Sequence, residues 1–120
     1  MTVRRLKTYT SQTGYVYEYY FVGKRSALPD DPLAPATEYV FDISSDRKTT
    51  YAVSVFLSPH VVESFATSRG RTLSEPEQYA AVKMRLLQAL DEITDMLQHG
   101  RRVTLDAEAL AALLESVGID

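Results

Sequence analysis

The chain has 120 residues, a net charge of −3, 45% apolar residues and 24% charged residues, a composition typical of one globular domain. It contains no cysteine, which excludes disulfide scaffolds, cysteine-ligated zinc sites and thiol catalysis. The basic start at residues 1–7 is followed by no apolar leader segment, and no apolar run reaches the length of a membrane span. We therefore expect a cytoplasmic protein that does not associate with a membrane.

The first part of the chain predicts two strands and a loop. Residues 3–10 form the first candidate strand, and residues 11–14 have the composition of a turn. Residues 15–25 form the second strand, because β-branched and aromatic side chains favour the pleated backbone. Residues 26–36 contain three prolines, which sustain neither a helix nor a β-ladder, so this segment is expected to be a loop.

Residues 37–57 predict an antiparallel hairpin. Apolar side chains alternate with polar ones in residues 37–43, and the alternation returns in residues 49–57. The residues between the two runs, 44–48, are polar and have the length of a hairpin connection. The side chains expected to face inward are Tyr39, Phe41, Ile43, Tyr51, Val53, Val55 and Leu57.

The rest of the chain predicts helices. Capping residues followed by apolar residues at helical spacing occur three times after residue 58. The longest of these segments carries an apolar stripe that ends at Leu97, and Gly100 lies where a helix-terminating glycine belongs. The predicted helices span residues 59–68, 75–98 and 107–117.

Together these elements predict an α+β fold that forms a single domain over residues 1–120. An antiparallel β-meander of three to four strands occupies residues 3–57. About three C-terminal helices pack on one face of this sheet, since each has an apolar side to bury.

The aromatic strand is the most unusual segment. Alternation places Tyr15, Tyr17, Tyr19 and Phe21 on one face, and Val16, Glu18, Tyr20 and Val22 on the other. Neither face is purely polar, so we expect the strand to be central in the sheet or to contact another molecule. The last helix is apolar nearly all round, which indicates either burial in its own core or an additional contact with a partner.

These two features predict a small non-catalytic binding or assembly protein, either a homodimer or a subunit of a larger complex. The residues expected to contact a protein partner are Tyr15, Tyr17, Tyr19, Tyr20, Leu110, Leu113 and Leu114. The alternative is a single-stranded nucleic-acid-binding module, in which tyrosine rings stack on bases beside basic residues. The residues expected to contact phosphates in that case are Arg4, Arg5, Lys7, Lys24 and Arg25.

No sequence motif indicates catalysis. The chain lacks a serine nucleophile elbow, a glycine-rich phosphate loop and any histidine spacing that would form a metal site, so we expect no enzyme, no metal and no cofactor. His60 lies three residues before Glu63 on one helix face, which leaves a hydrolase-type site around His60 as the enzymatic alternative.

Overall fold

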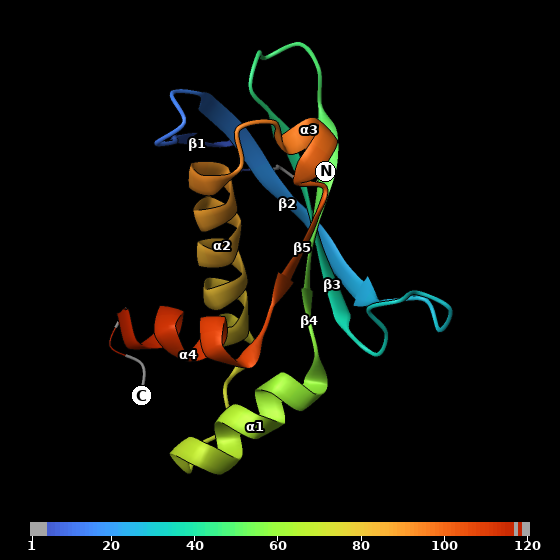
Figure 1. The fold of residues 1–120 in the computed structure, drawn as a ribbon, viewed down its shortest axis with the longest axis vertical. Coiled ribbons are helices and arrows are strands. Elements are labelled where there is room, and N and C mark those ends of the chain that lie inside the picture. Colours follow the sequence, from blue (N-terminus) through green and yellow to red (C-terminus); the bar gives the residue numbers. More distant parts are fainter. Residues whose placement is uncertain (1–4, 117, 119–120) are drawn as a thin grey trace.

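The computed structural model describes residues 5–116 and 118, and it contains one five-stranded sheet with four helices. The predicted α+β fold is confirmed (Figure 1). Residues 3 and 4 of the first predicted strand and residue 117 of the last predicted helix lie outside the described residues. The strands are β1 (Lys7–Thr10), β2 (Val16–Ser26), β3 (Thr37–Ser44), β4 (Tyr51–Leu57) and β5 (Arg102–Leu105). The helices are α1 (Pro59–Arg69), α2 (Glu75–Glu92), α3 (Met96–His99) and α4 (Ala107–Ser116).

Strands β1 to β4 form the predicted meander, in which each strand pairs antiparallel with the next. The predicted hairpin is confirmed as β3 and β4, with Tyr39 opposite Val55 and Phe41 opposite Val53. In the connecting turn, Asp46 Oδ1 accepts hydrogen bonds from the backbone N–H groups of Lys48 and Thr49. The chain then passes through three helices and returns as β5, parallel to β4.

The core lies between the sheet and α2 (Figure 1). A capping box between Ser74 and Glu77 starts this helix, and its side chains Val82, Leu86 and Leu90 are fully buried. They meet the inward-facing residues that the alternation of β3 and β4 predicts. Among the helices of the described residues, none is long and apolar enough to cross a lipid bilayer.

The predicted helix 75–98 is wrong beyond residue 92. Helix α2 ends at Glu92, Ile93 has an extended backbone, and Asp95 starts the short helix α3 by accepting a hydrogen bond from the N–H of Gln98. The aspartate therefore acts as a new N-cap, which interrupts the helix although the apolar spacing continues. As a result, Leu97 is 41% exposed instead of extending the buried stripe.

Strand β5 is absent from the sequence prediction. Its four residues alternate as exposed Arg102, buried Val103, exposed Thr104 and buried Leu105, but a run of this length gives little periodic signal. Gly100 precedes it with a φ of −121°, so its role is not that of a left-handed helix terminator. A Cβ at this position would overlap the end of the buried Met96 side chain, which would have to shift to make room for it.

Candidate functional site

The two faces of β2 differ in burial. Tyr17 and Tyr19 are 1% and 4% exposed because they point into the core, whereas Val16 and Val22 are 45% and 46% exposed. A β-bulge between Phe21 and Gly23 shifts the register of β2 against β3. Tyr17 and Tyr19, two of the predicted contact residues, are thus used by the chain's own core and offer no surface to a partner.

The C-terminal helix is buried in the same manner. Leu110 and Leu114 on α4 are fully buried, and Leu113 packs partly buried against the same core. Helix α4 contacts both α1 and α2, so its apolar sides meet elements of this chain. Of the two explanations for this apolar helix, burial in its own core accounts for Leu110 and Leu114. Ala112 lies on the exposed side of α4.

The sheet face opposite α2 remains partly open; we call it the helix-free face. Its residues away from the β2–β3 loop include Val16, Glu18, Tyr20, Val22, Val40, Asp42 and Ala52. The Tyr20 hydroxyl donates a hydrogen bond of 2.7 Å to Asp42, and Glu18 forms a 3.5 Å ion pair with Arg47. Val22 and Val40 line a shallow cavity of about 260 Å³ on this side of the sheet.

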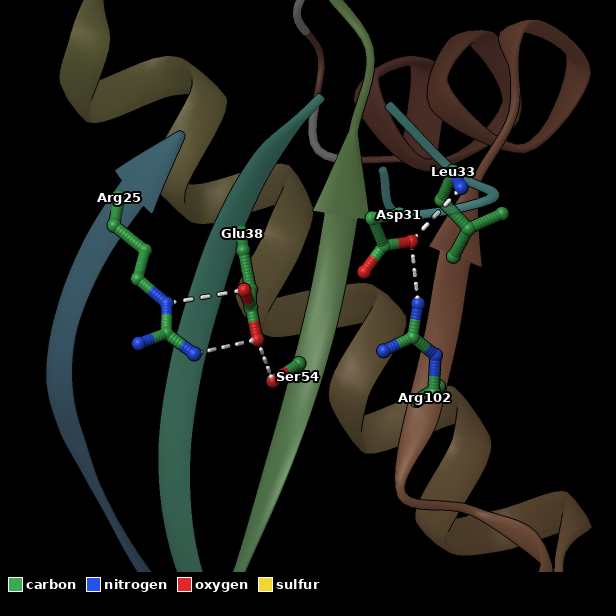
Figure 2. Close-up of polar contacts among 6 residues, drawn as sticks. All are labelled: Arg25, Asp31, Leu33, Glu38, Ser54 and Arg102. Carbon is green, nitrogen blue, oxygen red and sulfur yellow. Dashed lines mark hydrogen bonds and ion pairs between the residues drawn. The ribbon is translucent and has the colours of Figure 1, made fainter. Parts of the chain in front are cut away.

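At one end of this face, polar side chains hold the loop between β2 and β3 against the sheet (Figure 2). Glu38 on β3 accepts hydrogen bonds from Arg25 on β2 and from the Ser54 hydroxyl on β4, the latter at 2.6 Å. Asp31 in the loop pairs with Arg102 on β5 at 2.7 Å. The Glu38 contacts join β2, β3 and β4, and the Asp31–Arg102 pair ties the loop to β5, so this part of the face is covered.

Acidification is expected to weaken this cluster. Burial raises the pKa of Glu38, but hydrogen bonds from Arg25 and Ser54 outweigh burial and leave the pKa below its ordinary value of 4.5. The resulting stabilisation of the folded chain is complete above pH 4.5. It is lost as the pH falls through the pKa that Glu38 has in the folded state, which is lower than 4.5. We expect Glu38→Gln to lower the free energy of unfolding by about 1–2 kcal/mol at neutral pH.

Urea unfolding of both proteins across the acidic range measures this difference, which should shrink as the pH falls. Glu63→Gln, a change of the same kind on the exposed side of α1, controls for the altered net charge. A difference between wild type and Glu38→Gln that persisted at the lowest pH would contradict the role given to the Glu38 carboxylate.

The predicted basic residues do not share one surface. Arg4 lies outside the described residues, while Lys7 is exposed on the edge strand β1. Lys24 pairs with Glu75 at the start of α2, whereas Arg25 points to the opposite face and pairs with Glu38. Arg5 is exposed ahead of β1. Stacking on single-stranded nucleic acid stays a prediction; within the described residues, Lys24 and Arg25 lie on opposite faces of β2 and so do not form one basic surface beside exposed rings.

The enzymatic alternative rests on His60. His60 and Glu63 are both exposed on α1. A cavity of about 260 Å³ beside this helix has Glu63 among its lining residues and does not include His60. Within residues 5–116, no group of three histidine, aspartate or glutamate side chains could hold a metal ion. Both side chains of the enzymatic alternative thus lie on the surface of α1, and a site around His60 stays a prediction.

A larger cavity of about 480 Å³ lies at the other end of the sheet; we call it the tyrosine cavity. Its lining residues come from the start of β2, the β3–β4 hairpin and the segment that contains α3. The hairpin turn and α3 lie at the same end of the molecule in Figure 1. Tyr15, Tyr17 and Tyr51 contribute rings, and Asp46 and Asp95 contribute carboxylates. Sequence reasoning missed this site because these residues come from three distant segments with no shared motif.

The surroundings of Tyr51 reflect these carboxylates. Burial raises the pKa of Tyr51 to about 12, and the neighbouring Tyr17, Asp95 and Asp46 act in the same direction. Arg101 opposes the rise and lies 5.7 Å from the centre of the Tyr51 ring. The phenol of Tyr51 is therefore neutral at physiological pH, and the negative charge of the cavity comes from the aspartates.

Comparison with protein-family models, curated proteins and solved structures finds no match for this chain.

Proposed function

We propose that this chain is a small non-catalytic assembly protein of the cytoplasm that self-associates through the helix-free face. The observation that carries the proposal is the exposure of Val16 and Val22, 45% and 46%, on a strand that buries Tyr17 and Tyr19 of its opposite face in the core. Half-buried Val40 and Ala52 extend the apolar surface across β3 and β4. Val22 and Val40 line the same shallow cavity, and adjoining apolar side chains favour a protein contact more than scattered ones do.

The charges on this face favour a second copy as the partner. Glu18 is paired with Arg47, and Asp42 accepts a hydrogen bond from the hydroxyl of Tyr20. A partner that covers the face therefore leaves neither carboxylate buried without a partner. A twofold interface brings the same patch together with itself and so requires a self-complementary surface. An apolar sheet face meets this condition, because two such faces pack against each other as in a β-sandwich.

A lysine in the centre of the face should abolish this contact. In Val22→Lys, each subunit of a dimer would bury an ammonium group near its symmetry mate, so we expect a monomer. Light scattering at high micromolar concentration should give about twice the 13.5 kDa chain mass for the wild type and the single-chain mass for the variant.

Ala112→Lys is the matched control, because it adds the same charge to the exposed side of α4. The control is expected to keep the wild-type mass. A dimer that survives Val22→Lys but is lost in Ala112→Lys would move the interface to α4 and overturn the assignment to the sheet face.

A further inference from the structure

The tyrosine cavity has a lining with an unusual chemical bias. Eight of its ten lining side chains end in oxygen: the three tyrosines, the two aspartates and the hydroxyl residues Ser45, Thr49 and Thr94. The other two are Met96 and Leu97, so no lysine, arginine, histidine, asparagine or glutamine contributes a side-chain nitrogen to this lining. A surface of hydroxyls, ring faces and carboxylates favours a positively charged ligand over a negative one.

Asp46 keeps its negative charge. Backbone hydrogen bonds from Thr49 and Lys48 hold the pKa of Asp46 below its ordinary value. Neither Asp46 nor Asp95 forms an ion pair with a lysine or arginine in the described part of the chain. Each is also fixed by its local structure, Asp46 in the hairpin turn and Asp95 at the N-cap of α3. The cavity therefore presents pre-positioned charge without an internal counter-ion.

The aromatic rings supply the second element of a cation site. The ring centres of Tyr15 and Tyr17 are 6.1 Å apart and their planes are inclined by 57°, so the two rings form an angled wall. Tyr15 is 44% exposed at the rim and presents its ring to the cavity, whereas Tyr17 is 1% exposed and lies beside it in the core. Ring faces attract cations within about 6 Å of their centres, and such rings beside carboxylates are used to recognise ammonium groups.

We propose that the tyrosine cavity binds a small organic cation, an ammonium ion that carries alkyl groups. A cavity of about 480 Å³ has room for several non-hydrogen atoms and falls within the size range of small-molecule sites. The lining offers two carboxylates and no third carboxylate, histidine or cysteine, which favours an organic cation over a coordinated metal ion. The lining residues are separate from the helix-free face, so the proposal is independent of self-association.

Titration calorimetry of the full chain with choline, with ethanolamine and with the neutral analogue of choline that has carbon in place of nitrogen tests the proposal. Choline and ethanolamine distinguish a quaternary ammonium ion from a protonated primary amine, and saturable binding of either supports the site. Failure of both ammonium compounds to bind, or equal binding of the neutral analogue, would overturn it.

Variants then locate the binding. Asp95→Asn removes one charge but keeps a side-chain oxygen for the α3 cap, and it should weaken binding about fivefold or more. Asp106→Asn is the matched control, since Asp106 caps α4 in the same way through the N–H of Ala109 and does not line the cavity. Tyr15→Leu removes an exposed ring without disturbing the core and should weaken binding about two- to fivefold.

Unchanged affinity in both Asp95→Asn and Tyr15→Leu would place the cation elsewhere and overturn the proposal. Circular dichroism of each variant checks that the fold is retained. Ammonium-ion binding can be measured equally in a monomeric Val22→Lys chain, so its result is separable from that of self-association.

Discussion

Replacement of Phe56 by alanine is expected to lower the free energy of unfolding by about 3–5 kcal/mol. Phe56 on β4 is only 3% exposed, although it points away from Val55 and the helix side of the core. The Arg102 guanidinium lies 4.6 Å from its ring centre, and Asp31 holds that guanidinium. The alanine variant would therefore lose a buried ring together with the contact that holds the loop over the sheet. Chemical unfolding of the wild type and the variant measures the difference.

Phe56→Leu keeps most of the apolar volume and is the matched control, with an expected cost well below that of alanine. A further readout is limited proteolysis, which should cleave the loop of residues 27–36 faster in Phe56→Ala than in the wild type. A Phe56→Ala chain as stable as the wild type would contradict the claim that the loop covers this end of the helix-free face.

The second large effect is expected at the C-terminal helix. Leu114 is fully buried and belongs to the main core, so Leu114→Ala should lower the free energy of unfolding by about 2–5 kcal/mol. The same substitution at Leu28, which is 70% exposed in the loop, should change it by less than about 0.5 kcal/mol. Denaturant unfolding under one set of conditions compares the two variants.

The comparison also separates the two explanations for the apolar helix. A core leucine stabilises the chain by itself, whereas a leucine reserved for a partner affects association and leaves the unfolding of the monomer unchanged. A fully stable Leu114→Ala chain with altered association would therefore show that Leu114 serves a partner. Measurement in the Val22→Lys background removes the contribution of self-association on the helix-free face.

The meander could be predicted because its sequence signal is local. Alternation in residues 37–43 and 49–57 sets which side chains face α2, and Phe41, Ile43 and Val53 are fully buried as expected. The same rule correctly places Tyr17 and Tyr19 on one face of β2. These patterns depend only on neighbours within a strand, so one sequence is sufficient to read them.

Features made by distant contacts could not be predicted. Helix α2 ends near Asp91, whose carboxylate accepts hydrogen bonds from Tyr9 and from the backbone of Gln12, both from the start of the chain. Strand β5 has four residues and is defined by parallel pairing with β4. The tyrosine cavity likewise joins segments that only the fold brings together. None of these contacts leaves a periodic pattern in the sequence.

The most direct test of self-association is the molar mass of the wild-type chain, measured by sedimentation equilibrium from low to high micromolar concentration. Contact through the helix-free face predicts a mass that rises from 13.5 kDa toward about twice that value. The rise should persist in added salt, because the contact is mainly apolar and its charges are already paired within each chain. A mass of 13.5 kDa at every concentration would contradict it.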